Sequence, residues 1–372
     1  MKESPNASEG LNVGIENDSL HCPPIATAQN VLRILFTSYV FSPDIGGIET
    51  VSALLATEFA RAGHEVILVT KTSKQDGISW PFKVIRDPSP LKLFRLTRWS
   101  QVVFQNNISL SLAWPLYLIS RPWIINHQTW LGHLAEKTFF RNRLKTFLLR
   151  FATNITISQA VTDIIPCPSQ VVGNPYASNL FQANAATKRD REFLFLGRLV
   201  SDKGVDLLLN ALAELARNGL RPQLTIVGNG PEMGPLQTLA ASLGIADQVE
   251  FMGSKTGTEL AQILQRHQTM VIPSRWIEPF GVVALEGIAS GCAIVASNQG
   301  GLPDAVGPCG LFFVSGDFKS LATQLERMVR EPELHQAFSR ERPAHLEHFA
   351  PQVVAARILK HVTAAYRKHH PA

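Results

Sequence analysis

Short apolar runs alternate with amphipathic stretches along most of this chain. Residues 31–41, VLRILFTSYVF, and residues 64–70, HEVILVT, have the apolar character of strands buried on both faces of a parallel sheet. Between them, a loop with a glycine pair leads into a helix that runs to Arg61. The same alternation continues through QVVFQ at 101–105 and WIINH at 123–127. This pattern predicts a Rossmann-like sheet covered by helices.

A second series of strands and helices follows. It starts with EFLFLG at 192–197, and an amphipathic helix begins after Gly204. The segment from Asn174 to Arg191 contains a proline, several alanines and mixed charges, so we expect it to link two domains. A chain of 372 residues is long enough for two domains of ordinary size. The sequence therefore predicts an α/β protein with two Rossmann-like domains.

The stretch from Ile272 to Gly301 carries the strongest candidate site. An apolar strand ends at Ile272, a polar loop with Glu278 follows, and helical spacing begins after Pro279. Open α/β sheets bind ligands at such loops, between the carboxyl end of a strand and the amino end of a helix. An anion or a ring of hydroxyls would face the free N–H groups of Phe280, Gly281, Val282 and Val283.

Two glutamates flank this turn, Glu278 in the loop and Glu286 a turn or two inside the helix. Their spacing alone is weak evidence. However, Pro-Phe-Gly after Glu278, Leu285 before Glu286 and the Val-Ala-Ser strand resemble the signature of the retaining glycosyltransferases of family 4, which have the GT-B fold. The resemblance implies that Glu278 lies beside the donor sugar and that Glu286 binds the ribose hydroxyls of the nucleotide. The alternative is a helix with one capping and one solvated glutamate.

Arg198 and Lys203 stand on either side of the turn that follows the strand EFLFLG. Two cations at the mouth of such a loop can bind a diphosphate, the arginine through its planar fork and the lysine as a point charge. The family resemblance implies that both residues bind the nucleotide phosphates and stabilise the leaving group. The alternative is a pair of solvated surface charges.

Three glycine turns complete the predicted donor site. Gly46 and Gly47 stand between the first strand and the first helix, where a glycine pair lets the backbone approach a ligand. Such a pair is more often simple turn chemistry, but this one resembles the loop that family 4 enzymes place opposite the donor phosphates. By the same resemblance, Gly228 lies near the nucleotide and Gly253 lies near its base.

His127 ends the strand WIINH, so we expect its ring at the carboxyl end of a strand in the first domain. A lone histidine is usually a surface or core residue. Family 4 members carry a histidine at this strand end that reaches the donor sugar, which implies that role for His127. They commonly have an acidic residue next, where this chain has Gln128, so the role of that second residue stays open.

Composition excludes several other classes of protein. Four cysteines form no CxxC pair and have no histidine at ligand spacing, so neither a disulfide framework nor a zinc site is expected. No Asp-x-Asp motif occurs, which agrees with transfer without a metal, and no cofactor beyond the donor is expected. The first thirty residues predict a disordered leader, and the longest apolar stretch, Ile108–Ile119, is too short to span a bilayer. No basic repeat with interleaved aromatics suggests nucleic acid binding.

We therefore expect a retaining glycosyltransferase that moves a hexose from a GDP- or UDP-linked sugar. The expected parts are a leader at 1–30, an acceptor domain at 31–175, a nucleotide-sugar domain at 190–350, and a final helix at about 351–368 that returns to the first domain. Arg198, Lys203 and the helix amino end would stabilise the departing diphosphate, while Glu278 would orient the sugar. The alternatives are an inverting GT-B transferase or epimerase with a base in the first domain, and an inactive nucleotide-sugar-binding subunit.

The predicted acceptor domain is strongly basic. Between Lys83 and Arg150 there are eleven lysines and arginines but two acids, although the whole chain has a formal net charge of +5. Interleaved with these cations are Leu91, Leu93, Phe94, Trp99, Phe139, Phe140, Phe147 and Leu148. Such a surface suits anionic lipid. We therefore expect a peripheral enzyme on the cytoplasmic face of a membrane, acting on a lipid-linked glycan in cell-surface polysaccharide biosynthesis. The alternative is a soluble basic face with these aromatics in the core.

Overall fold

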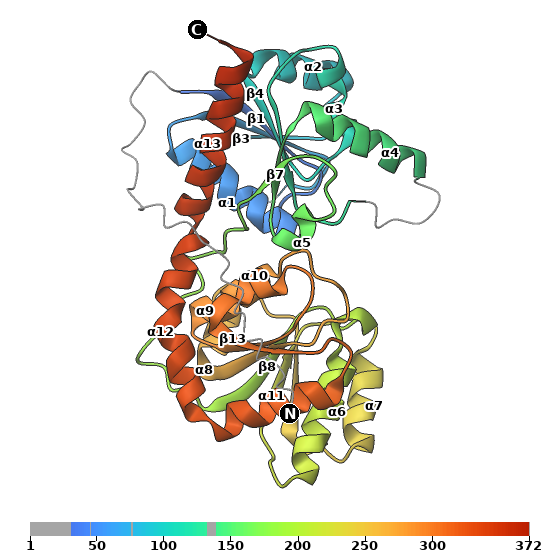
Figure 1. The fold of residues 1–372 in the computed structure, drawn as a ribbon, viewed down its shortest axis with the longest axis vertical. Coiled ribbons are helices and arrows are strands. Elements are labelled where there is room, and N and C mark those ends of the chain that lie inside the picture. Colours follow the sequence, from blue (N-terminus) through green and yellow to red (C-terminus); the bar gives the residue numbers. More distant parts are fainter. Residues whose placement is uncertain (1–30, 45, 76, 132–138, 372) are drawn as a thin grey trace, which may run out of the picture.

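The computed structural model describes residues 31–44, 46–75, 77–131 and 139–371, except for the side chains of residues 139–141. The expected leader at 1–30 lies outside these residues. Two parallel sheets follow one another along the long axis of the molecule, and helices cover both (Figure 1). This arrangement confirms the predicted α/β fold with two Rossmann-like domains.

The first sheet has seven strands in the order β3-β2-β1-β4-β5-β6-β7, and all neighbouring strands are parallel. The strands are β1 (Arg33–Ser38), β2 (Glu65–Thr70), β3 (Lys83–Arg86), β4 (Val102–Asn106), β5 (Trp123–His127), β6 (Thr153–Thr156) and β7 (Ser169–Val171). The helices are α1 (Gly47–Arg61), α2 (Pro90–Trp99), α3 (Leu110–Ala113), η2 (Trp114–Tyr117), α4 (Phe139–Leu148), η4 (Leu149–Phe151) and α5 (Gln159–Thr162).

The second sheet has six strands in the order β10-β9-β8-β11-β12-β13, again all parallel. The strands are β8 (Arg191–Leu196), β9 (Leu224–Val227), β10 (Val249–Gly253), β11 (His267–Ile272), β12 (Ala293–Ser297) and β13 (Gly310–Phe313). The helices are η5 (Ser201–Lys203), α6 (Val205–Arg217), α7 (Met233–Ser242), η6 (Ala246–Gln248), α8 (Gly257–Arg266), α9 (Val282–Ser290), α10 (Leu302–Val306), η7 (Gly307–Cys309), α11 (Phe318–Arg330), α12 (Pro332–His348) and α13 (Pro351–His369).

In each sheet, the order in which the strands are added reverses beside the first strand, where β1 pairs with β4 and β8 pairs with β11. Open sheets of this type bind ligands outside the carboxyl ends of their strands, at this switch point. The strands are buried on both faces because successive side chains alternate. In β1, Ile34 and Phe36 join one core while Leu35 joins another.

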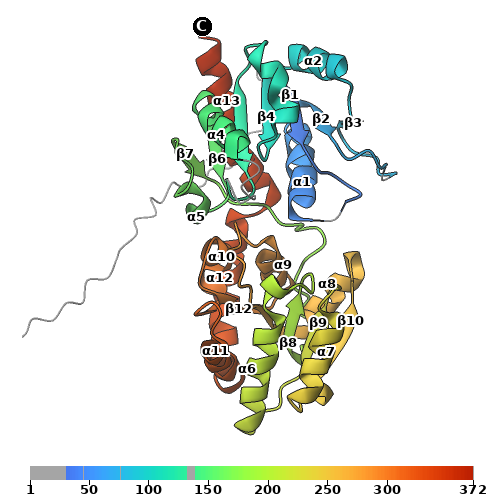
Figure 2. The same ribbon diagram turned by 90° about the vertical axis from the view of Figure 1, so that its right-hand side faces the viewer.

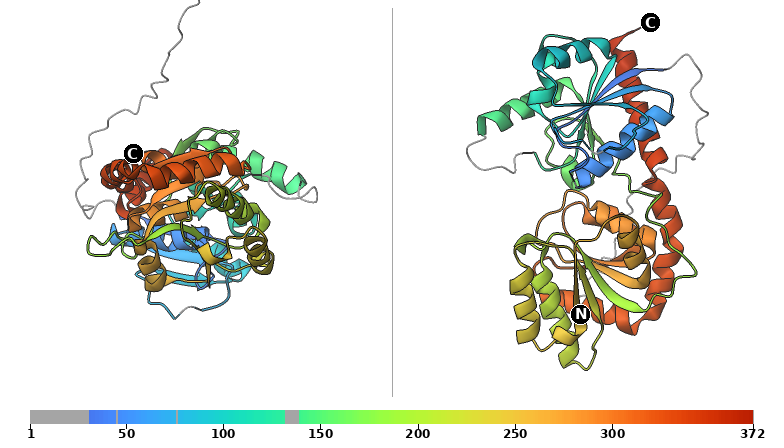
Figure 3. Two further views of the ribbon diagram at one scale, coloured as in Figure 1. Left: turned by 90° about the horizontal axis from the view of Figure 1, so that it is seen from below. Right: turned by 180° about the vertical axis from the view of Figure 1, so that it is seen from behind.

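The final helix packs against the first domain, although it follows the second domain in the sequence. Val354, Ile358 and Val362 of α13 recur at helical spacing and are fully buried in the core that contains Phe36. The preceding helix, α12, packs on the second domain beside α9 and β12. Seen from the side and from behind, α12 lies along the second domain and α13 continues along the first (Figures 2 and 3). The chain therefore crosses between the domains twice, once before β8 and once between α12 and α13.

Candidate active site

The carboxyl edges of the two sheets meet at one junction. Trp130, just after β5, donates through its Nε1–H to the carbonyl oxygen of Ile277 at 2.7 Å. Ser158, just after β6, donates through its hydroxyl to the carbonyl oxygen of Pro279 at 2.7 Å. Ile277 and Pro279 stand on either side of Glu278, in the loop between β11 and α9. Hydrogen bonds from the first domain therefore hold the central loop of the predicted donor site.

Asp304 makes a third contact across this junction. Its Oδ2 accepts a hydrogen bond of 2.7 Å from the N–H of Gln159, at the amino end of α5. Burial raises the pKa of Asp304, the hydrogen bond from Gln159 opposes that rise, and the charge of Asp163 adds to it. One domain thus supplies a carboxylate that satisfies an N–H group at a helix end of the other.

Glu278 and Lys203 form an ion pair in which Lys203 Nζ donates to Glu278 Oε1. The same oxygen accepts a hydrogen bond of 3.0 Å from Ser274 Oγ. Both partners are largely buried, with 20% of the lysine and 16% of the glutamate side chain exposed. The structure therefore brings together Glu278, the residue predicted to contact the donor sugar, and Lys203, one of the two residues predicted to bind the phosphates.

Gly204 allows the loop of Lys203 to reach the loop of Glu278. Its φ is +70°, and a Cβ at this position would lie 2.1 Å from the carbonyl oxygen of Pro273. Any larger residue would combine backbone strain with a steric clash. The ion pair therefore depends on a glycine that contributes no functional group of its own.

Gly228 has a packing role of a similar kind. A Cβ there would lie 1.8 Å from the carbonyl oxygen of Gly197, and the N–H of Gly228 donates to the carbonyl oxygen of Gly253 at 2.9 Å. This contact seats the β9–α7 turn against the loop of Arg198. At Gly253, a Cβ would meet no atom within 4 Å. The packing therefore explains a glycine at 228 without a ligand, while Gly253 borders open space.

Helices α1, α6 and α9 are among those that begin at the carboxyl edges without a side-chain cap. The cap residues of α1, α6 and α9 are Gly46, Gly204 and Gly281, and none offers a side chain to the first N–H groups. By contrast, Ser89, Ser158 and Asp317 cap α2, α5 and α11. Uncapped amino ends carry partial positive charge and unpaired donors. The amino ends of α6 and α9 would favour a bound anion such as a diphosphate. At α1, the carboxylate of Glu49 in the first turn already accepts a hydrogen bond from its own N–H.

The residues around the start of α9 differ in which of their groups could contact a ligand. The ring of Phe280 is buried against that of Phe349, with centroids 5.5 Å apart, so only its backbone is available to a ligand. Gly281 has a φ of +103°, and Val282 is partly buried against the core. All three would therefore contribute N–H groups, as their prediction assumed.

Arg198 is exposed directly after β8. No hydrogen bond or ion pair joins its side chain to another of the described residues. A guanidinium has five N–H donors, so Arg198 has its full donor set available for a ligand.

Gly46 and Gly47 stand at the start of α1, on the carboxyl edge of the first sheet. A Cβ at Gly47 would meet no atom within 4 Å, and one at Gly46 would meet only the side chain of Glu49, at 2.5 Å. The packing of the backbone does not require glycine at Gly47. This leaves the close approach of a ligand as its predicted purpose.

Glu286 lies on the second turn of α9, and although the residue is partly exposed, its carboxyl group is enclosed by the protein. Burial raises the pKa of its carboxyl from an ordinary 4.5 to about 7. The group is therefore only partly ionised near neutral pH. Hydroxyl donors of a ligand would favour the ionised form, because a carboxylate accepts hydrogen bonds better than a carboxylic acid does.

His127 is buried in the interior of the first domain, with 1% of its surface exposed. Its Nε2–H donates to Asn154 Oδ1 at 3.0 Å, and the amide nitrogen of Asn154 donates to the carbonyl oxygen of Leu149, which fixes that orientation. Burial lowers the pKa of His127 to about 4, and the bond to Asn154 only partly opposes this. The ring is therefore neutral at neutral pH, and a sugar would reach it only if the surrounding groups moved.

The structure gives Gln128 a role that the sequence left open. Its side-chain amide and that of Asn174 exchange two hydrogen bonds of 2.9 Å, and both residues are buried. Asn174 starts the segment that leads to the second domain. An acidic residue at position 128 could accept only one of these two hydrogen bonds, so the amide suits this pair.

Trp130 and Ser158 are not among the site residues predicted from the sequence. Both lie two or three residues after a strand of the first sheet, in HQTW and in SQAV, which is the one signal that could have found them. Their partners are backbone carbonyl oxygens of the second domain, which no residue pattern reveals.

The apolar residues within the basic stretch divide between core and surface. The expectation that they share a surface with the cations was wrong for Leu93 and Leu148, which point inward from α2 and α4 into the core. Phe94 and Trp99 are partly buried, while Leu91 and Phe147 are exposed. The side chains of Phe139 and Phe140 lie outside the described residues.

One exposed apolar cluster remains beside cations, and we call it the α4–η4 surface. It consists of Leu144, Phe147, Arg150 and Phe151. The two phenylalanine rings are 5.5 Å apart, and the Arg150 guanidinium lies 5.8 Å from the centroid of Phe147. Phe151 is 68% exposed, which is unusual for a phenylalanine. Large exposed apolar groups of this kind often mark an interaction surface.

Within the described residues, no three histidine, cysteine, aspartate or glutamate side chains are grouped so that they could hold a metal ion. No helix in this part of the chain has the length and hydropathy needed to cross a bilayer.

Comparison with known proteins identifies related sequences. Residues 177–344 match the family model of the group 1 glycosyl transferases. An MMP alpha-(1->4)-mannosyltransferase of Mycolicibacterium hassiacum is 33% identical over 64% of this chain and 58% of its own. A D-inositol 3-phosphate glycosyltransferase of Corynebacterium jeikeium is 34% identical over 48% of this chain and 47% of its own. The chain thus spans about half the length of the curated relatives that it matches.

Solved structures extend the likeness to both domains. Sucrose-phosphate synthase from Thermosynechococcus elongatus superposes with a TM-score of 0.76 at 21% identity, over 91% of this chain and all of its own. Anabaena HepE, solved in complex with UDP and glucose, superposes with a TM-score of 0.72 at 19% identity, over 90% of this chain and all of its own. These structures establish the GT-B fold. The match to the group 1 glycosyl transferase model lies within residues 177–344, which include most of the second domain.

Proposed function

We propose that this protein transfers a hexose from a nucleotide-diphosphate sugar to a saccharide acceptor, with retention of the anomeric configuration. The donor would be linked to UDP or GDP and would lie on the second domain. The acceptor would lie on the first domain. Two relatives with glycosyltransferase names and a GT-B neighbour that binds UDP and glucose support this class of reaction.

The observation that carries the proposal is the grouping of cationic and polarised groups at the junction. Arg198 and Lys203 lie in the loop that leads to the uncapped amino end of α6, and α9 begins nearby with its own uncapped amino end. Negative charge develops on the departing diphosphate as the bond to the anomeric carbon stretches. Donors already oriented toward that charge stabilise the transition state more than the ground state.

The surroundings of Glu278 and His127 favour retention. Glu278 Oε1 is already paired with Lys203 and Ser274, which suits a residue that orients the sugar rather than a free nucleophile. An inverting enzyme needs a base for the acceptor hydroxyl. His127 is poorly suited to that task, because it is buried and its pKa is lowered to about 4. In the retaining reaction, the acceptor hydroxyl attacks the face that the diphosphate leaves.

The α4–η4 surface supports a lipid-linked acceptor. Phe147 and Phe151 are exposed beside Arg150, in a segment whose cations greatly outnumber its acids. Aromatic rings can enter the boundary region of a bilayer while neighbouring cations bind anionic headgroups. The enzyme would then work at the cytoplasmic face of a membrane, on a glycan whose lipid carrier is held there.

A binding experiment tests the donor site. Thermal unfolding with a panel of nucleoside diphosphates should show a rise in Tm for one base, since a ligand of the folded state stabilises it by mass action. Arg198→Ala should reduce that rise, whereas Arg217→Ala, at the far end of α6, should leave it unchanged. Absence of a rise with every nucleotide would contradict the proposal.

Product analysis separates the remaining alternatives. NMR of the product with the matching sugar nucleotide should show the anomeric configuration of the donor. Inversion would instead support an inverting GT-B transferase. Nucleotide binding without transfer to any saccharide would support an inactive binding subunit.

A further inference from the structure

The second domain has a cleft of about 680 Å³ at the amino edge of its sheet. Gln268 and Ala293, at the starts of β11 and β12, line one side, and residues of α12 line the other. The candidate active site lies beyond the carboxyl end of β11. A strand of six residues separates the two regions by about 17–20 Å. The cleft is therefore distinct from the proposed donor site.

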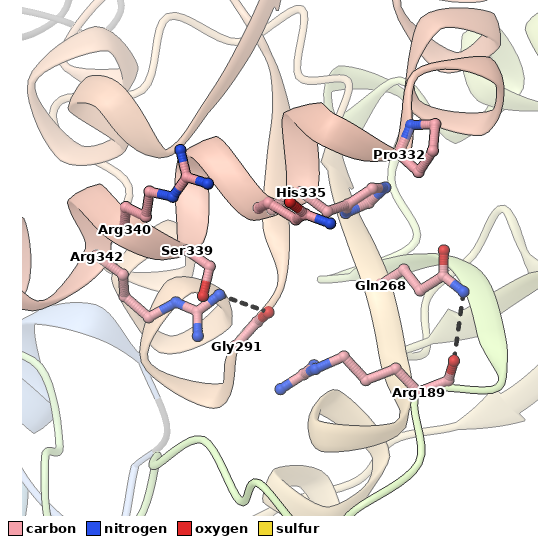
Figure 4. Close-up of a pocket in the computed structure, with 10 residues that line it drawn as sticks. Arg189, Gln268, Gly291, Pro332, His335, Ser339, Arg340 and Arg342 are labelled. Atoms are coloured by element: carbon pink, nitrogen blue, oxygen red, sulfur yellow. Dashed lines mark hydrogen bonds between the residues drawn. The ribbon is translucent and has the colours of Figure 1, made fainter.

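Arginines dominate this cleft, as Figure 4 shows. Arg189 comes from the segment before β8, and Arg340 and Arg342 come from α12, which also provides His335. None of the residues that line the cleft is acidic. Asp190, next to Arg189, already forms an ion pair with Arg266 on the outer surface. The lining therefore carries three positive charges without a carboxylate to balance them.

Capping of α9 explains part of this arrangement. Arg189 donates to the carbonyl oxygens of His267 and Ser290, both at 2.7 Å, and Arg342 donates to that of Gly291 at 2.9 Å. The bonds to Ser290 and Gly291 satisfy carbonyl groups at the carboxyl end of α9, and the bond to His267 satisfies one at the end of α8. They leave most of the N–H groups unused, since each guanidinium carries five. The Nε of Arg342 is buried and has no partner among the described residues.

Arg340, unlike Arg189 and Arg342, does not bind a backbone carbonyl group within the described ranges. Its side chain is exposed, and no hydrogen bond or ion pair joins it to another described residue. Glu341, its neighbour in sequence, forms no ion pair with either arginine in the described structure. An arginine that serves only to cap α9 would not require a second arginine beside it.

The cations also disfavour one another. The pKa of Arg342 is lowered by burial and then by the positive charge of Arg189. The pKa of His335 is lowered by burial, and Arg189 again contributes. A bound anion would offset the repulsion from Arg189 at both groups, because it would add an opposite charge where none of the lining residues provides one.

We propose that this cleft binds a phosphate or phosphate-monoester group, at a site separate from the nucleotide-sugar donor. Planar guanidinium groups pair with the oxygens of phosphate through parallel hydrogen bonds. A volume of about 680 Å³ leaves room for a small organic group attached to the phosphate. The ligand class is thus a small phosphorylated molecule, and its phosphate is the part that the arginines would recognise.

The position of the arginines gives the bound phosphate a structural consequence. Arg189 belongs to the segment that enters the second domain, and Arg340 and Arg342 belong to the helix that leads back to the first. Both crossings between the domains therefore contribute to one site. A phosphate bound there would tie them together against the carboxyl end of α9, whose amino end lies at the junction.

Calorimetric titration with inorganic phosphate tests the proposal. The titrations use the Arg198→Gln variant as background, so that phosphate binding at the junction is weakened. We expect binding in this background, and a rise in Kd of about tenfold when Arg340→Gln or Arg342→Gln is added, the usual effect of losing one charged hydrogen bond. Lys319→Gln, which removes the same charge from α11, should not change Kd.

Two results would overturn the proposal. One is the absence of phosphate binding in the Arg198→Gln background. The other is an unchanged Kd in both cleft variants. Arg340 is exposed, so Arg340→Gln should fold normally and its result does not depend on stability. Amide exchange gives a second readout, since phosphate should slow exchange in α12 in the background variant but not after Arg340→Gln.

Discussion

Lys203 Nζ donates directly to Glu278 Oε1, so the loop after β8 is tied to the loop after β11 at the amino ends of α6 and α9. Both side chains are mostly buried, and Ser274 is the only other hydrogen-bond partner that the described structure gives the carboxylate. The pair therefore fixes the Glu278 carboxyl group beside the place proposed for the sugar, and it holds the Lys203 ammonium beside the place proposed for the diphosphate.

Removing Lys203 should damage both stability and transfer. Lys203→Ala leaves the Glu278 carboxylate without its cation in a largely buried position, so the free energy of unfolding should fall by about 1–3 kcal/mol. Turnover should fall on the order of a hundredfold or more, because transition-state charge loses a partner. Urea unfolding and steady-state kinetics measure the two effects.

A second substitution separates these two roles. Adding Glu278→Gln to Lys203→Ala removes the unpaired charge, so part of the lost stability should return while transfer stays low. Recovery of transfer together with stability would mean that Lys203 acts on folding alone.

Gly204→Ala should destabilise the protein more than the same change at the other end of α6. The new Cβ would lie 2.1 Å from the carbonyl oxygen of Pro273, at a φ of +70°. Gly219 has a φ of +79° but no atom within 4 Å of the corresponding Cβ. Gly219→Ala should therefore cost about 1–2 kcal/mol from backbone strain alone, and Gly204→Ala should cost roughly 1–3 kcal/mol more. Equal Tm values for the two variants would contradict this account.

The sequence predicted the fold well because its strands are continuous apolar runs, buried on both faces, while apolar residues of its helices recur at helical spacing. It also predicted which loops lie at the carboxyl edges, which is where the structure places Arg198, Lys203 and Glu278. It could not show that Lys203 binds Glu278, because that contact depends on the close approach of two loops at Gly204. The interior position of His127 was equally hidden, since the end of a strand can point to solvent or to the core.

Ionisation of Glu286 should make nucleotide binding depend on pH. The pKa is raised to about 7, and the carboxylate is the form that accepts hydrogen bonds from ribose hydroxyls. Affinity for the nucleoside diphosphate should therefore rise as the pH increases through about 7. Glu286→Gln should weaken binding and reduce this pH dependence. Calorimetry over a pH series measures both, and an unchanged affinity in the variant would contradict the ribose contact.

Glu286 should also contribute to the pH dependence of stability. Its pKa is higher in the folded state than the ordinary value of 4.5, so the folded state binds this proton more tightly than the unfolded state does. Stability contributed by the protonated group is therefore lost as the pH rises from about 4.5 to about 7. In denaturant unfolding, the free energy of unfolding of Glu286→Gln should therefore fall less over this pH range than that of the unmodified protein.

The hydrogen bond from Trp130 should affect transfer without affecting the fold of either domain. Trp130→Phe keeps an aromatic ring but removes the Nε1–H that donates to the carbonyl oxygen of Ile277. The loss of one hydrogen bond across the junction should lower kcat/KM about fivefold, with little change in Tm. Trp99→Phe, on α2 of the same domain, is the matched control. A kcat/KM equal to that of the unmodified protein would show that the bond does not position the Glu278 loop.

Membrane binding through the α4–η4 surface can be tested with liposomes. The protein should sediment with anionic vesicles and not with neutral ones, and salt should release it, because the cations around Arg150 would bind lipid headgroups. Phe147→Ser combined with Phe151→Ser should weaken the binding on the order of tenfold or more, since both rings would lose their apolar contact with the bilayer. Val329→Ser, an exposed apolar residue of α11 in the second domain, should have no effect. Equal absence of the protein from anionic and neutral vesicles would defeat the membrane proposal, and it would leave a soluble saccharide as the acceptor.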